Sequence, residues 1–112
     1  MGKKENEFQG KLIKEIKERG PGSMVLKNDP NYIQGIPDLL VLYEDNWAAL
    51  ECKKSKKDME VNCQPNQPYY ISTMNQMSFA SFIYPENKEE VLDELERSFK
   101  VVREACDTES EQ

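Results

Sequence analysis

The chain has 112 residues, enough for one domain but not for two. It carries 15 basic and 21 acidic residues, giving a net charge of −6, and it contains no histidine. Its three cysteines, Cys52, Cys63 and Cys106, show no C-x-x-C spacing. This composition excludes zinc fingers, histidine-based metal sites and catalytic triads that depend on histidine. A metal site in this chain would have to use oxygen ligands, as Mg²⁺ and Mn²⁺ sites do.

The acidic excess lies in the second half of the chain. Residues 1–60 hold 11 basic and 11 acidic residues, whereas residues 61–112 hold 4 and 10. We expect residues 1–103 to form a single domain and residues 104–112 to form an acidic, disordered tail. No apolar run approaches the roughly 20 residues that span a bilayer, and no secretion signal follows the first lysines. We therefore expect a soluble cytoplasmic protein that makes no membrane contact.

The first predicted element is a helix that ends at the Gly20-Pro21-Gly22 cluster. Its apolar residues recur at helical spacing: Phe8, Leu12, Ile13 and Ile16. On a helical wheel Glu5 falls in the middle of this apolar stripe and Glu7 falls on the opposite side. The wheel favours Glu5 as an inward-facing carboxylate only if the helix already begins by residue 5, so the choice between the two stays open.

Three strands are predicted next. Residues 24–26 form a short strand, and a polar loop covers residues 27–31. The near-continuous apolar run of residues 35–43 suits a strand covered on both faces. After a turn at residues 44–46, residues 47–53 return as a strand in which Glu51 and Lys53 point to the same face. Pairing about this turn places position 38 opposite positions near 52 or 53.

The remaining chain alternates loops, helices and a strand. Residues 53–57 are the one concentrated basic stretch, followed by a loop to Pro68 and a helix from about residue 67 to 76. Residues 79–84 read as a strand. A last helix starts near Asn87, and its apolar stripe consists of Val91, Leu92, Leu95, Phe99 and Val102. The elements together indicate an α/β or α+β domain built round one sheet.

Asp38, Glu51 and Lys53 are expected to meet at one end of the sheet. Two carboxylates at such close range repel each other unless a cation lies between them. Mg²⁺ binds through one or two carboxylates and keeps several waters, which leaves room for a phosphate and an attacking water. Lys53 would then orient or deprotonate that water or stabilise the developing charge. In the structural alternative, Glu51 and Lys53 form a surface ion pair and Asp38 caps a turn.

The spacing of these residues also resembles a known nuclease motif. Pro37-Asp38, a spacer of 12 residues and Glu51-Cys52-Lys53 resemble the PD-(D/E)xK nuclease superfamily. Residues 35–40, with the sequence GIPDLL, look like the VRR-NUC and phage Holliday-junction-resolvase-like branches of that superfamily. Two further elements are similar to these branches: the pattern Glu5-x-x-Phe8-Gln9-x-x-Leu12, and the Q-x-x-Y element at residues 67–70.

The resemblance covers roughly residues 5–95 and implies a fold, a cofactor and a set of site residues. The fold would be a restriction-endonuclease-like αβββαβ core, one mixed sheet flanked by helices. The cofactor would be Mg²⁺ or Mn²⁺, held by Asp38, Glu51 and the main-chain carbonyl of Cys52. Glu5 would complete the site directly or through water, Lys53 would be the catalytic lysine, and Gln67 would orient the site or touch a phosphate.

Other residues are weaker candidates for DNA contact. Lys54, Lys56 and Lys57 could hold the DNA backbone, although a solvated loop explains them equally well. Lys27, Asn28, Tyr32 and Gln34 flank the expected cleft, where they could grip a phosphate or stack a base; a polar turn is the alternative. Tyr70, from the Q-x-x-Y element, completes the candidate DNA contacts.

The sequence thus predicts a metal-dependent endodeoxyribonuclease acting on branched or otherwise structured DNA, as a resolvase does. Resolvases cut two strands symmetrically, so we expect a homodimer. If the gene belongs to a phage, the protein would act in the cytoplasm of the bacterial host. Two alternatives remain: a catalytically inactive nuclease-fold module that binds DNA or assembles, and a small protein-interaction domain.

Overall fold

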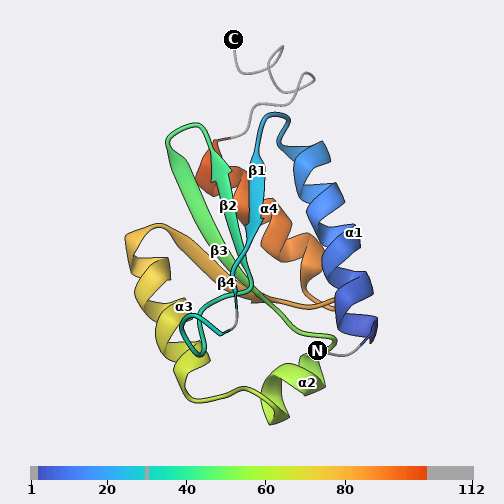
Figure 1. The fold of residues 1–112 in the computed structure, drawn as a ribbon. Coiled ribbons are helices and arrows are strands. Elements are labelled where there is room, and N and C mark those ends of the chain that lie inside the picture. Colours follow the sequence, from blue (N-terminus) through green and yellow to red (C-terminus); the bar gives the residue numbers. More distant parts are fainter. Residues whose placement is uncertain (1–2, 30, 101–112) are drawn as a thin grey trace, which may run out of the picture.

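The computed structural model of the protein describes residues 3–29 and 31–100 (Figure 1). The tail at residues 104–112, predicted to be disordered, lies outside the described residues, as does Val102. No helix in the described ranges is both long and apolar enough to cross a membrane. The elements are, in chain order, α1 (Lys3–Arg19), β1 (Met24–Lys27), β2 (Leu39–Tyr43), β3 (Asn46–Cys52), α2 (Lys56–Val61), α3 (Asn66–Met77), β4 (Phe79–Ile83) and α4 (Lys88–Phe99).

The strands form one mixed sheet in the order β1-β2-β3-β4. The pairs β1–β2 and β2–β3 are antiparallel, whereas β3 and β4 run parallel. Parallel neighbours need a long crossover, which α2 and α3 provide here (Figure 1). The predicted αβββαβ core with one mixed sheet is therefore confirmed, with α2 added inside the crossover and α4 at its end.

The turn between β2 and β3 is tighter than the sequence analysis expected. Tyr43 pairs with Asn46, so the turn contains only Glu44 and Asp45, and Glu44 adopts a positive φ of 55°. Asn46 is thus the first residue of β3 and not part of the turn. The shorter turn shifts the register, because Leu39 pairs with Leu50 and the next position outward, Asp38, lies beside Glu51. The expected pairing of position 38 with 52 or 53 was wrong by one to two residues.

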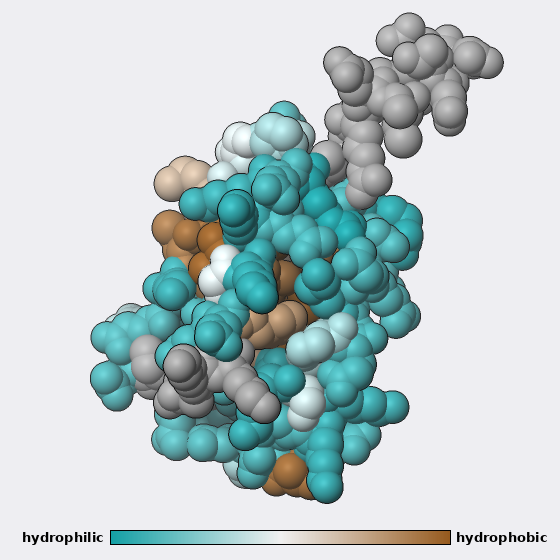
Figure 2. All heavy atoms as spheres, turned by 90° about the vertical axis from the view of Figure 1, so that its right-hand side faces the viewer, coloured by the Kyte–Doolittle hydropathy of each residue, from teal (hydrophilic) through white to brown (hydrophobic). Residues whose placement is uncertain are grey.

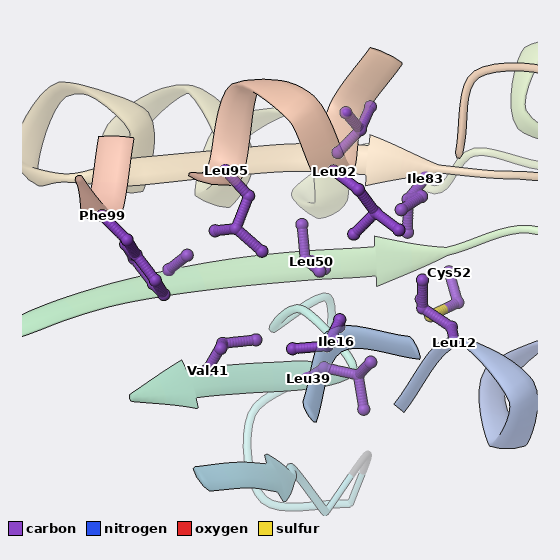
Figure 3. Packing of buried hydrophobic residues seen from close by; sticks show 12 residues of the cluster. Leu12, Ile16, Leu39, Val41, Leu50, Cys52, Ile83, Leu92, Leu95 and Phe99 are labelled. Carbon is purple, nitrogen blue, oxygen red and sulfur yellow. The ribbon is translucent and has the colours of Figure 1, made fainter. Parts of the chain in front are cut away.

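The hydrophobic core lies between the sheet and two helices, α1 and α4 (Figure 3). Leu12 and Ile16 of α1 and the apolar stripe of α4 pack against one face of the sheet. The strand residues on that face are buried: Leu39, Val41, Ala48, Leu50, Cys52 and Ile83. Successive side chains of a strand point to opposite faces, so Glu51 and Lys53 point away from this core.

The other face of the sheet is only partly covered. Helix α3 packs against β3 and β4, and none of its residues is buried. The edge strand β1 remains open, with Met24 58% exposed and Leu26 42% exposed. Figure 2 shows the α1 side of the molecule as mostly hydrophilic, with apolar residues gathered along its left flank.

Helix α2 replaces part of the loop expected after the basic stretch. The Ser55 hydroxyl accepts a hydrogen bond from the main-chain N–H of Asp58 at 3.0 Å, a helix-capping contact. A serine followed three residues later by an acid is a helix-start signal, which the analysis of residues 53–57 as a basic stretch overlooked. None of the residues of α2 is buried.

Arg19 ties the end of α1 to α4. Its guanidinium lies 3.3 Å from Glu15, 2.5 Å from Glu89 and 2.9 Å from both Asp93 and Glu96. Burial acts to lower the pKa of Arg19, but the carboxylates of Asp93, Glu96 and Glu89 outweigh it and raise the pKa. Lys88 also lies 2.8 Å from Glu15 and 3.3 Å from Glu89, so two cations partly offset the charge of these acids. The Arg19 contacts hold α1 against the helix behind the sheet.

Candidate active site

Asn28 holds the chain where it enters β2. Its main-chain N–H donates to the carbonyl of Asp38 at 2.8 Å, and its side-chain amide donates to the carbonyl of Pro37 at 2.7 Å. Proline has no N–H of its own and a restricted φ. These two hydrogen bonds and the burial of Pro37 therefore restrict the backbone conformation with which Asp38 enters β2. Of the two roles expected for Asn28, a ligand contact and a polar turn, these hydrogen bonds fit the structural one.

Asp38 and Glu51 are joined by reciprocal hydrogen bonds. The Asp38 N–H donates to Oε1 of Glu51 at 3.2 Å, and the Cys52 N–H donates to Oδ2 of Asp38 at 3.0 Å. The Glu51 carboxylate thus accepts from the main chain of Asp38, and the Asp38 carboxylate accepts from the residue that follows Glu51. This arrangement exists because the register places positions 38 and 51 side by side at the end of the β2–β3 hairpin.

Glu51 is a buried carboxylate, with a side chain only 4% exposed. Burial is the largest cause that raises the pKa of Glu51, from 4.5 to about 8, and the nearby Asp38 carboxylate raises it further. Lys53 and the Asp38 N–H act in the opposite direction. Burial likewise raises the pKa of Asp38, against the Cys52 N–H and Lys53. Both acids therefore lie where additional positive charge would stabilise their ionised forms.

Gln67, at the start of α3, completes the surroundings of Glu51. Its Nε2 donates to Oε2 of Glu51 at 2.9 Å, while its Oε1 accepts from the Gln64 N–H at 3.1 Å. Both amide ends are thus used, which fixes the side chain and leaves Glu51 with a donor on each oxygen. The structure therefore places Gln67 at the acidic pair.

Lys53 lies on the same face as Glu51, and only 7% of it is exposed. Its Nζ lies 3.5 Å from the carbonyl of Asn62, just after the end of α2. The positive charge of Lys53 lowers the pKa of Glu51, Asp38 and Glu5. The three predicted charged residues of the motif therefore converge at one end of the sheet.

Glu5 belongs to the same electrostatic group, and Glu7 does not. Burial raises the pKa of Glu5, and the negative charges of Asp38 and Asp58 raise it further. Glu7, on the other side of α1, is exposed. The helix does begin before residue 5, so the condition of the helical-wheel argument is met and Glu5 is the helix carboxylate that faces the site.

The donor set suits a hard cation that keeps most of its waters. In residues 3–29 and 31–100, no three acidic or cysteine side chains are arranged as a ready-made metal cage. Asp38 and Glu51 supply two carboxylates, and Mg²⁺ commonly uses one or two with water in its remaining positions. The Cys52 thiol is fully buried in the core, and burial raises its pKa, so the side chain is not suited to metal binding.

A cleft opens directly beside the acidic pair. It has a volume of about 260 Å³ and is lined by Gln34, Gly35, Ile36, Asp38, Glu51, Gln64 and Gln67. Its two sides come from the loop before β2 and from the segment leading into α3. Gln64 was not predicted from the sequence, because its position depends on how residues 62–66 pack against the earlier loop.

The candidate DNA-binding residues surround this region with different degrees of exposure. Lys27, at the end of β1, is exposed, as are Lys54, Lys56 and Lys57 around the start of α2. Tyr70 is half-buried and packs edge to face against Tyr69, with ring centroids 5.2 Å apart. None of these lysines and tyrosines lines the cleft, whereas Gln34, another candidate, does.

Comparison with known proteins supports the fold. No family model matches the sequence, and no curated protein matches it. A solved structure described as a VRR_NUC domain is similar to this chain, with a TM-score of 0.62 and 22% sequence identity. The match covers 86% of this chain and 97% of that structure. The chain therefore shares the fold of that domain, in agreement with the fold that the resemblance of its motifs implied.

Proposed function

We propose that this chain is a metal-dependent nuclease that hydrolyses phosphodiester bonds in branched or otherwise structured DNA. The observation that carries the proposal is the convergence of Asp38, Glu51 and Lys53 beside an open cleft, in a nuclease fold. Burying charged groups costs free energy, and strongly perturbed charged clusters are concentrated at functional sites. The structural alternative of an exposed ion pair fits poorly, because Glu51 and Lys53 are both buried.

In this proposal Asp38, Glu51 and the main-chain carbonyl of Cys52 would hold Mg²⁺ or Mn²⁺, and Glu5 would complete the site directly or through water. When bound, such an ion polarises the scissile phosphate and makes a metal-bound water more acidic. Lys53 orients the attacking water and stabilises the charge that develops on the phosphate. Gln67 holds the Glu51 carboxylate in place through its 2.9 Å hydrogen bond.

The test is cleavage of a four-way junction and a plasmid in the presence of Mn²⁺. We expect cleavage that stops with EDTA and falls by at least about 100-fold in Asp38→Asn and Lys53→Ala, as for the loss of a group that stabilises a transition state. Asp45→Asn, in the exposed turn at the far end of the hairpin, and Lys14→Ala, on the exposed side of α1, are the matched controls.

The rivals predict different results in the same experiment. An inactive nuclease-fold module would bind the junction without cutting it, and a protein-interaction domain would neither bind nor cut. Lys54, Lys56 and Lys57 are proposed to contact the DNA backbone, so replacing them with alanine should weaken binding and reduce its dependence on salt.

The proposal also includes a homodimer, since two linked sites would cut two strands of a branched substrate symmetrically. The surface that favours self-association is β1, an edge strand with exposed apolar side chains at Met24 and Leu26. Light scattering at several protein concentrations gives the mass. Met24→Lys, which places a charge on this edge, should favour the monomer.

A further inference from the structure

Part of the lining of the cleft beside the acidic pair, here called the neutral wall, carries no charge. A phosphate group would not require such uncharged residues. Apart from Asp38 and Glu51, its lining consists of three glutamines, Gly35 and Ile36, with no lysine or arginine. A bound water takes up about 30 Å³, so a cleft of about 260 Å³ is larger than the waters of one hydrated cation require. The space next to the carboxylates is suited to an uncharged, partly apolar group with polar edges.

Gln34 and Gln64 face each other across this wall. The Nε2 of Gln34 donates to Oε1 of Gln64 at 3.3 Å. Among residues 3–29 and 31–100, Oε1 of Gln34 and Nε2 of Gln64 have no partner. The pair therefore leaves one acceptor and one donor free on two hydrogen-bonded side chains that both line the cleft.

The wall is held in place by a close contact between its two segments. Gly35 has a φ of +91°, and a Cβ at this position would lie 2.5 Å from the Cβ of Asn66. The Asn66 side chain also donates to the Gln34 carbonyl at 3.4 Å. The loop before Asp38 thus lies directly on the first turn of α3, which brings the two glutamines together.

We propose that this glutamine pair binds the Watson–Crick edge of an unpaired base next to the scissile phosphate. Every base presents a donor beside an acceptor on that edge, and amide groups can rotate to match either order. In a duplex this edge is occupied by the complementary base. The pair would therefore recognise that a nucleotide is unpaired, not which base it carries, with Ile36 providing apolar contact to the ring.

This inference rests on the proposed nuclease function and names its substrate feature. The substrates for its test are a labelled duplex, the same duplex with one unpaired bulge nucleotide, and the same bulge without its base. The abasic bulge keeps the flexibility of the DNA and removes only the base. Cleavage rates are measured in Mn²⁺ for the wild type and for a Gln34→Ala, Gln64→Ala double variant.

We expect the wild type to cleave at the bulge at least about fivefold faster than in the duplex, the lower end of what a paired amide–base contact contributes. The abasic bulge should lose this advantage. The double variant should lose it too, with no further effect of removing the base, because both changes delete one interaction. Gln76→Ala, exposed at the far end of α3, should behave as the wild type.

The outcomes separate this inference from the function on which it rests. An advantage that survives removal of the base, or survives in the double variant, overturns the base site while the nuclease proposal stands. Equal cleavage of all three substrates by the wild type also overturns the base site and leaves the nuclease proposal standing. If the wild type leaves these three substrates and the four-way junction intact in Mn²⁺, the nuclease proposal fails and the base site fails with it.

Discussion

Ionisation of Glu51 should control the stability of the metal-free protein. The side chain is 4% exposed, and burial together with the Asp38 carboxylate raises its pKa from 4.5 to about 8. An acid whose pKa is higher in the folded state binds its proton more tightly when folded. Stability from this group is therefore complete below pH 4.5 and is lost as the pH rises from 4.5 to about 8. The raised pKa values of Asp38 and Glu5 act in the same direction.

The size of the effect follows from the pKa difference. One pKa unit corresponds to about 1.4 kcal/mol, so Glu51 alone should lower the free energy of unfolding by about 3 kcal/mol between pH 5.5 and pH 8. In a domain of this size that loss lowers the melting temperature by roughly 10 °C. A divalent cation bound by Glu51 should offset the loss, so Mn²⁺ should stabilise the protein more at pH 8 than at pH 5.5.

The Glu51→Gln variant separates the effect of the Glu51 charge on stability from the effect of its shape. Glutamine has a single side-chain acceptor, whereas Glu51 accepts from both Asp38 and Gln67, so the variant loses one hydrogen bond at a cost of about 1 kcal/mol. In EDTA we expect it to match the wild type at pH 5.5 and to exceed it by about 3 kcal/mol at pH 8. It should also lose the stabilisation by Mn²⁺.

Thermal unfolding followed by circular dichroism from pH 5.5 to pH 8, with EDTA or Mn²⁺, measures these differences. Glu60→Gln, an exposed acid in α2, is the matched control and should keep the wild-type slope. The reasoning is refuted if wild-type stability rises with pH over this range, or if Glu51→Gln keeps the same slope.

Three further substitutions test other parts of the structure. Asn28→Ala removes the hydrogen bond to the Pro37 carbonyl; we expect weaker Mn²⁺ binding by calorimetry and a lower kcat at similar KM, because Asp38 is no longer held in position. Gly35→Ala should destabilise the fold by about 1 to 3 kcal/mol, since a Cβ there meets Asn66 and the positive φ disfavours alanine. Arg19→Met should lower the free energy of unfolding by about 1 to 3 kcal/mol, because four carboxylates lose their shared cation.

Each of these substitutions has a control of the same type. Asn31→Ala changes an exposed asparagine in the same loop as Asn28 and should leave Mn²⁺ binding unaltered. Gly10→Ala introduces a Cβ with no atom within 4 Å and should not destabilise α1. Arg97→Met removes an exposed cation from α4. Variants that behave like their controls would show that the named contacts have no energetic role.

Helix α2 and the exact register of the hairpin were not predicted from the sequence. The turn residues allowed either two or three positions between the strands, and only the observed pairing of Tyr43 with Asn46 set the register. The position of Asp38 beside Glu51 follows from the assignment of Asn46 to the strand and not to the turn. The capping serine of α2 was visible in the sequence, but the basic residues around it suggested a loop.

The sequence by itself determined the order of the elements other than α2 and the meeting of Asp38, Glu51 and Lys53. These residues lie at the ends of one hairpin, and alternation along a strand with pairing across a short turn is a local property of the chain. The tertiary structure alone decided the positions of Glu5, Gln64 and Gln67 and the positioning contact of Asn28. Each depends on how a helix or loop packs against the sheet from a distant part of the chain, and no local spacing encodes that packing.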